Sequence, residues 1–174
     1  MRTRRWLGAT ALAIVLVAGI VVGEADAARR ASFTARVHGR VVRAKGRSVA
    51  AGYTADPTAA LLVIGAAKLT RFRVGARIWQ LGVGCLTTDL AAAVLPVTLT
   101  CNGNYTESRL GRPAETRGWT TDTGMRVTVT LFAGNRARGT VTGTFENANA
   151  TNPGDPPVTL ENGKFSVVFL PTGG

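Results

Sequence analysis

The sequence has little of what catalytic sites usually require. It contains one histidine, His38, two cysteines and ten acidic residues among its 174 residues. A Ser-His-Asp or Cys-His arrangement would have to use His38, yet its neighbours Val37 and Gly39 place this histidine in an ordinary strand. The acidic residues form no close Asp/Asn ladder of the calcium-loop type. We therefore expect a protein that is not an enzyme and that binds no metal ion or other cofactor.

Aromatic residues are also scarce, at 6% of the chain. Proteins that stack exposed bases interleave aromatic and basic residues, whereas Phe33, Tyr53 and Phe72 are scattered. Trp79 and Trp119 could form a carbohydrate platform, but a tryptophan inside an alternating strand is more typical of the core. We expect no specific nucleic-acid partner, and we expect both tryptophans to be buried.

Sustained helical periodicity with capping residues is missing after residue 27, and short alternating runs separated by turn residues take its place. The alternating run Met125 to Phe132, a turn at residues 133–136 and the run Ala137 to Phe145 predict a hairpin. Asn102-Gly103 and Asn162-Gly163 suit type I′ turns, and they predict two more hairpins.

Four further segments are also expected to be strands, which gives about nine or ten short strands in all. This number and spacing are typical of sandwiches and barrels. The sequence therefore predicts an all-β fold, with a single antiparallel β-sandwich or barrel-like domain. Residues 89–94 are expected to form a loop or one helical turn, and residues 147–157 a long exposed connection that is a candidate binding loop. The four additional strands are expected at Ser32–Val42, Val49–Thr54, Ala60–Leu69 and Ala76–Val83.

The chain begins with the pattern of a secretory signal peptide. Arg2, Arg4 and Arg5 precede an apolar run over residues 6–27, which ends in the small-residue cleavage site Ala25-Asp26-Ala27. Cleavage there would place the mature protein in the periplasm or outside the cell.

Removal of residues 1–27 as a signal peptide would leave one antiparallel β domain over residues 28–174. An uncleaved leader would instead anchor the protein to the membrane. The pair Arg4-Arg5 also resembles a twin-arginine signal, but Gly8 departs from that motif and favours the ordinary Sec route. We expect no integral membrane segment after cleavage.

The two cysteines, Cys85 and Cys101, are expected to form a structural disulfide. An even pair with a short intervening loop is most simply a bridge in an oxidising compartment. A redox pair usually has Cys-x-x-Cys spacing, and a metal site needs more ligands than two thiols and one histidine supply. Closing a loop of about 15 residues would contribute about 3 kcal/mol to stability.

Charge is the bulk property in which this chain is unusual, because Lys and Arg outnumber Asp and Glu by 21 to 10. Residues 28–174 carry a net charge of +10, and all of it comes from residues 28–77, where eleven basic residues accompany Asp56. A one-sided basic field attracts polyanions, which outside the cytoplasm are anionic lipid headgroups, acidic polysaccharide or extracellular nucleic acid.

Alternation places Arg71 and Arg73 on one strand face, with Phe72 and Val74 on the other. An arginine row on an outer face is therefore expected. A solvated basic face needs no specific partner, so solubility alone is the competing explanation. The polyanion hypothesis rests on six residues: Arg36, Arg40, Arg43, Arg71, Arg73 and Arg77.

Two segments near the C-terminus, residues 139–146 and 158–167, carry a resemblance to a known group. Gly143-Thr144-Phe145 is followed by a Pro-containing loop and then by Asn162-Gly163-Lys164-Phe165. This resembles the ending of uncharacterised exported bacterial β-sandwich proteins of unknown function, and it covers about a quarter of the mature chain. The resemblance implies an exported β-sandwich and transfers no catalytic residue.

From the β class and the missing chemistry we expect a secreted or periplasmic, non-enzymatic module with a binding or structural role in the envelope or outside the cell. Its expected partner is an anionic polymer or an envelope surface, bound through the basic N-terminal half. The alternative is a small β-barrel that carries an apolar ligand, suggested by the run Leu61 to Ile64 and by the high Ala and Gly content. An enzymatic role would need His38 beside a nucleophile or a carboxylate. The sequence leaves the oligomeric state open.

Overall fold

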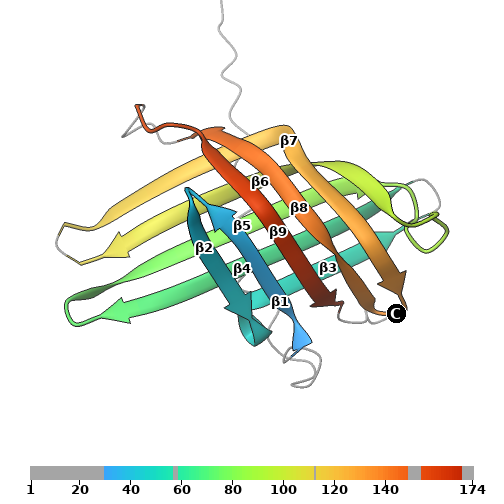
Figure 1. Cartoon of the computed structure of the whole chain (residues 1–174), viewed down its shortest axis with the longest axis horizontal. Helices are drawn as coiled ribbons and strands as arrows, with labels where there is room; N and C mark the ends of the chain where they lie inside the picture. The colour runs from blue at the N-terminus through green and yellow to red at the C-terminus, as the bar shows by residue number, and fades with distance from the viewer. Residues whose placement is uncertain (1–29, 57–58, 112, 149–153, 170–174) are drawn as a thin grey trace, which may run out of the picture.

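The computed structural model describes residues 30–56, 59–111, 113–148 and 154–169. Within these ranges nine antiparallel strands form one sheet, in the order β2-β1-β9-β8-β7-β6-β5-β4-β3 (Figure 1). The strands are β1 (Ser32–Val37), β2 (Arg40–Lys45), β3 (Val49–Ala55), β4 (Ala60–Phe72), β5 (Gly75–Thr87), β6 (Val97–Leu110), β7 (Glu115–Ala133), β8 (Arg136–Asn147) and β9 (Val158–Val168).

The sheet curls into a half-barrel. Its edge strands are β2 and β3, which a short 3-10 turn, Gly46–Ser48, connects. β2 contacts β4 and β3 contacts β9, so the edges approach strands far from them in the sheet order (Figure 1). The all-β antiparallel prediction is confirmed. The two-sheet sandwich is not confirmed, because the described strands all belong to one sheet, and the expected leader, residues 1–27, lies outside the described residues.

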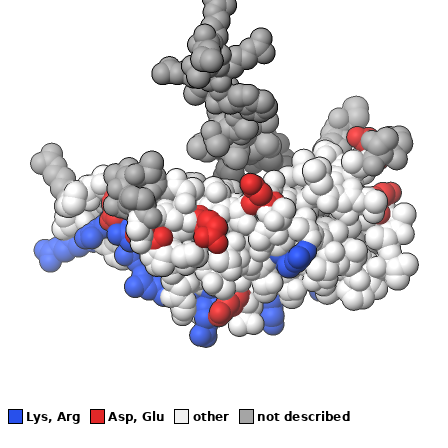
Figure 2. Space-filling model, turned by 90° about the horizontal axis from the view of Figure 1, so that it is seen from above, with Lys and Arg blue, Asp and Glu red and all other residues white. Residues whose placement is uncertain are grey.

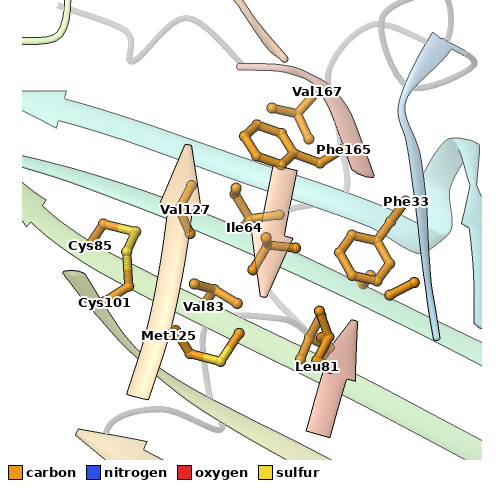
Figure 3. Close-up of a cluster of buried hydrophobic side chains, with 14 of the residues drawn as sticks. Phe33, Ile64, Leu81, Val83, Cys85, Cys101, Met125, Val127, Phe165 and Val167 are labelled. Atoms are coloured by element: carbon orange, nitrogen blue, oxygen red, sulfur yellow. A yellow bond between two sulfur atoms is a disulfide. The ribbon is translucent and has the colours of Figure 1, made fainter. Parts of the chain in front are cut away.

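The core lies on the inner face of the curl, because apolar side chains occupy alternate positions along the strands. In β4, for example, Leu62 and Ile64 are buried, whereas Leu61 before them is exposed and Val63 between them is half-buried. Both tryptophans, Trp79 and Trp119, are buried as expected. Figure 3 shows buried side chains from different strands converging on this interior, among them Phe33, Ile64, Leu81, Val127 and Phe165.

Packing in this interior is tight enough to require glycine on β8. A Cβ atom at Gly139 would lie 2.0 Å from the carbonyl oxygen of Thr128 and 2.8 Å from a ring carbon of Phe165. At Gly143 the same atom would lie 2.5 Å from the sulfur of Met125. Atoms this close cannot coexist without movement of the backbone or of a core side chain.

The prediction of turns at the two Asn-Gly dipeptides is wrong. Asn102-Gly103 lies in the middle of the continuous strand β6, where a Cβ at Gly103 would meet Met125 and Phe145 at 3.1 Å. Asn162-Gly163 lies inside β9, where Asn162 has a φ of 51° and the pairing with β8 shifts register. Glycine serves close packing in the first case, and the second dipeptide forms a β-bulge.

The hairpins differ from expectation at one further place. The predicted β7–β8 hairpin is confirmed, with Ala133 paired to Arg136 across a two-residue turn. The expected single strand Ser32–Val42 is instead a hairpin, because His38 (φ 49°) and Gly39 (φ 71°) form a turn between β1 and β2. Two successive positive φ values are what a type I′ turn requires. His38 therefore lies at a turn, and its placement in an ordinary strand is wrong.

The end of the half-barrel that contains the β5–β6 loop is closed by packing. Cys85 and Cys101 form the expected disulfide across β5 and β6. Residues 89–94 form a loop that contains one turn, as predicted, and the side chain of Leu90 is buried. The hydroxyl of Tyr53 donates to Asp89 at 2.8 Å and accepts from the backbone N–H of Leu90 at 2.9 Å.

Candidate charged site on the inner face of the sheet

The opposite end of the half-barrel is built differently, because β4, β5, β6 and β7 continue past the core. In Figure 1 the β4–β5 and β6–β7 hairpins extend to the left of the β1–β2 hairpin. The last inner-face positions of the core here are Tyr105 and Trp119, which pair across β6 and β7. Beyond this pair the inner face carries mainly charged residues, with the buried Trp79 of β5 and with Thr70 of β4 among them.

Two rows of residues cross the four strands on this face, and the strand register defines them. In the first row Trp79 of β5 lies opposite both Lys68 of β4 and Glu107 of β6, and Glu107 lies opposite Arg117 of β7. The second row, one step further from the core, pairs Arg77 with Thr70 and with Arg109, and Arg109 with Glu115. Directly opposed residues share a face of the sheet. We call these eight residues, together with Arg40, the charged end.

Arg40 belongs to this group although it comes from another part of the sheet. It is the first residue of β2 and lies opposite Val37, whose buried side chain marks the inner face. Its positive charge acts on Tyr105, as does that of Arg77. The two arginines therefore approach the same point from strands at different places in the sheet.

Tyr105 links the core to the charged end. Its hydroxyl donates a 2.6 Å hydrogen bond to the Oε1 atom of Glu107. Burial is the main cause that raises the pKa of Tyr105, and the hydrogen bond and negative charge of Glu107 raise it further, against smaller opposing effects of Arg77 and Arg40. The phenol consequently stays protonated and remains a donor to Glu107.

Arg117 is held by two carboxylates. Its Nε atom lies 2.6 Å from Oε1 of Glu115, and its Nη1 atom lies 3.4 Å from Oδ1 of Asp155. The hydrogen bond that Arg117 donates to Glu115 is the main cause that raises the pKa of Arg117, followed by the charge of Asp155. These contacts attach the connection between β8 and β9 to the charged end.

The β1–β2 turn and the β8–β9 connection both reach Trp119, the aromatic residue beneath the charged rows. The indole Nε1 of Trp119 donates to the carbonyl oxygen of Pro156 at 3.0 Å. The ring of His38 meets the same indole edge-on, with 5.8 Å between ring centroids. The predicted connection at residues 147–157 thus contacts this end through its described part, while residues 149–153 lie outside the described ranges.

The structure separates the six arginines of the polyanion hypothesis into three groups. Arg40 and Arg77 belong to the charged end. Arg71 lies on the outer face at the end of β4, and Arg73 lies in the β4–β5 turn. Because β4 ends at Phe72, Arg71 and Arg73 do not share a strand face, and that prediction is wrong. The remaining two, Arg36 and Arg43, lie on the outer face of β1 and β2.

Three cations of the charged end were missed by sequence reasoning. Lys68 lies within the basic segment, but its place beside Trp79 depends on the β4–β5 register. Arg109 and Arg117 lie in the electrically neutral half of the sequence, and β6 and β7 bring them beside Arg77 and Glu107. Figure 2 shows Lys and Arg side chains gathered toward the left end of the visible face, where Figure 1 places the β4–β5 and β6–β7 turns.

Comparison with known proteins returned no match to a family model, to a curated protein or to a solved structure. Among the described residues no group of three or more His, Cys, Asp or Glu side chains is placed to hold a metal ion. The described ranges contain no helix with the length and apolar character of a membrane-spanning segment.

Proposed function

We propose that this protein is an exported, non-enzymatic binding module that recognises a polyanion through its charged end. The observation that carries the proposal is the placement of Lys68, Arg77 and Arg109 on three adjacent strands of the inner face, with Arg40 of β2 on the same face. Cations in a fixed array attract a repeating anion more strongly than the same charges scattered over a surface.

The local charge balance supports this function. Two acidic residues accompany five cations at the charged end, and both acids are engaged: Glu107 accepts from Tyr105, and Glu115 pairs with Arg117. Within the described part of the chain, Arg117 is the one cation of this set that forms an ion pair. The exposed Lys68, Arg77 and Arg109 are left to face solvent or a ligand.

The burial of the tryptophans narrows the class of ligand. Trp79 is 8% exposed and Trp119 is 3% exposed, so neither presents a ring face for stacking against a sugar or a base. Recognition at this end would therefore depend on charge and on the donors of Arg and Lys. A repeating anion such as an acidic polysaccharide or an anionic lipid surface fits that chemistry better than a particular nucleic-acid sequence.

The alternative, a barrel that carries an apolar ligand, receives less support from the packing. The described interior is filled by buried side chains from all nine strands, and Figure 3 shows part of this cluster. Glycines such as Gly139 and Gly143 bring backbone against Phe165 and Met125 rather than lining an open space.

Export and removal of residues 1–27 remain part of the proposal. The disulfide between Cys85 and Cys101 is compatible with an oxidising compartment. Kinship with exported bacterial β-sandwich proteins is likewise an inference from the C-terminal segments alone.

The experiment that tests the proposal is retention on heparin across a salt gradient, with the protein recovered after export and its N-terminus verified by mass spectrometry. The triple variant Arg40→Gln, Arg77→Gln, Arg109→Gln removes three cations from the charged end. The matched control Arg36→Gln, Arg43→Gln, Arg138→Gln removes three exposed arginines elsewhere on the sheet. We expect the first variant to elute at clearly lower salt than the control. Elution of both at the same salt would show that only net charge matters, and the proposal would fail.

A further inference from the structure

The tip of the β4–β5 hairpin combines exposed apolar side chains with arginines. Phe72 and Val74 are 58% and 88% exposed, and Leu69 and Leu110, on the outer face of β4 and β6 near this turn, are 47% and 46% exposed. Arg71 and Arg73 alternate with the first two along the chain. We call these six residues the hairpin tip. Resting on the proposed function, we propose that the hairpin tip inserts into the headgroup region of an anionic lipid bilayer, and that this bilayer is the polyanion recognised.

The composition of this turn differs from that of the other two-residue turns. The β1–β2 turn is His38-Gly39 and the β7–β8 turn is Gly134-Asn135, both built from residues that suit solvent-exposed turns. The β4–β5 turn is Arg73-Val74, and it directly follows Phe72. An exposed phenylalanine and valine at the most protruding point of a hairpin gain nothing from solvent, whereas a bilayer would bury both.

The backbone of the tip is fixed in place by its neighbour. Gly75 has a φ of 119°, and a Cβ atom there would lie 2.2 Å from the carbonyl oxygen of Leu110. The turn therefore rests directly on the end of β6, and only glycine allows this approach. Because Phe72 and Val74 project from a turn that is already ordered, insertion would cost little additional backbone entropy.

Charge and apolar surface occur in the order that a lipid surface requires. Phe72 and Val74 lie at the turn, Arg71 and Arg73 lie between and beside them, and Arg77 and Arg109 follow one row further back. Apolar side chains reach the boundary between headgroups and acyl chains, while arginines at the level of the headgroups bind phosphate. A soluble polyanion would use the arginines alone, so the apolar residues favour the bilayer.

The test is sedimentation of the exported protein with vesicles of phosphatidylcholine and phosphatidylglycerol, compared with vesicles of phosphatidylcholine alone. The variant Phe72→Ser, Val74→Ser removes the apolar tip. The control Leu86→Ser, Val94→Ser removes two exposed apolar residues, 76% and 91% exposed, near the β5–β6 loop at the opposite end of β5. We expect wild type and control to bind the anionic vesicles with the same affinity. We expect the affinity of the tip variant to be lower by about tenfold or more.

A second pair of measurements separates this inference from the function on which it rests. Arg71→Gln, Arg73→Gln should weaken binding to the anionic vesicles about 30-fold, since each arginine near such a surface contributes about 1 kcal/mol. The tip variant Phe72→Ser, Val74→Ser should keep its heparin retention, because it loses no charge. Unchanged vesicle binding by this variant would overturn the bilayer inference and leave a soluble polyanion as the ligand. Equal heparin elution of the two triple arginine variants described above would overturn the proposed function itself.

Discussion

Tyr105 donates a hydrogen bond of 2.6 Å to Glu107, two residues further along the same strand and on the same face of the sheet. Tyr105 is 1% exposed and belongs to the core, whereas Glu107 is partly exposed and stands in the first charged row. The contact therefore marks the border between the packed interior and the charged end. Because Glu107 accepts this hydrogen bond, its carboxylate is less able to neutralise the neighbouring arginines of the charged end.

Replacing this donor should cost stability. Tyr105→Phe removes the hydroxyl and leaves the Glu107 carboxylate without it, and we expect a loss of about 1.5 kcal/mol in the free energy of unfolding. Glu107→Gln keeps an acceptor for Tyr105 while removing the negative charge, so it should cost less and should shift heparin elution to higher salt. Urea denaturation and a salt gradient measure the two effects. Equal stability of wild type and Tyr105→Phe would show that the hydrogen bond contributes nothing.

The glycines of the core can be tested with a matched pair. A methyl group at Gly139 would collide with the backbone of Thr128 and the ring of Phe165, while nothing lies within 4 Å of a Cβ at Gly52. We expect Gly139→Ala to lower the free energy of unfolding by about 1–3 kcal/mol, as overpacked cores do. Gly52→Ala should change it by about 0.5 kcal/mol or less. Comparable thermal stability of the two variants would contradict the packing described for β8.

Asp89 should make stability depend on acid pH. The backbone N–H of Ala91 and then the hydroxyl of Tyr53 donate to its carboxylate, and they lower the pKa of Asp89 from its ordinary value of 3.8. A lowered folded-state pKa stabilises the protein above the ordinary value, and this stabilisation is lost as the pH falls through the folded-state pKa. Asp89→Asn should therefore melt below wild type at pH 7, and the gap should narrow as the pH falls below 3.8. A gap that stays constant across that range would refute this role.

The disulfide should stabilise the fold without being needed to form it. Cys85 and Cys101 are 16 residues apart, and in the chain-entropy model a closed loop of this length contributes about 3 kcal/mol. The double variant Cys85→Ala, Cys101→Ala should keep the far-ultraviolet circular dichroism of a β protein and lose roughly that free energy of unfolding. Loss of the β spectrum at room temperature would mean that the curled sheet depends on the bridge.

The strands were predictable because the side chains of a strand alternate between the two faces of the sheet, whichever strands are its neighbours. In β7, Val127 and Val129 alternate with Arg126 and Thr128 in the sequence, and the structure buries the two valines and leaves their neighbours more exposed. Strand ends were less predictable. Ala60–Leu69 extends to Phe72, because pairing with β5 continues beyond the core as far as Gly75.

The misplaced turns show a limit of local sequence patterns. Gly103 and Gly163 follow asparagine as they would in a type I′ turn. In the structure, however, a Cβ atom at either position would lie too close to a neighbouring residue, Phe145 for Gly103 and Val141 for Gly163. The turn that the structure does contain, at His38-Gly39, has the two positive φ values of a type I′ turn. Histidine is a weaker predictor of such a turn than asparagine. Only the tertiary contacts distinguish a glycine that forms a turn from a glycine that makes room for the packing of a neighbouring residue.

The charged end could be predicted only in part. Arg40 and Arg77 were identified from the clustering of basic residues, but their proximity depends on the curl of the sheet. Arg109 and Arg117 were overlooked because they come from the neutral half of the chain and enter the site through the registers of β6 and β7. A charge map along the sequence cannot show rows that run across strands.

The measurement that tests the central claim most directly is a nuclear magnetic resonance titration of the exported protein with a short heparin oligosaccharide. We predict that the largest amide shift changes occur at Lys68, Arg77 and Arg109, with the indole signal of Trp79 among those affected. Changes confined to the outer face around Arg36 and Arg43, or spread evenly over all exposed arginines, would contradict the assignment of the charged end as the binding site.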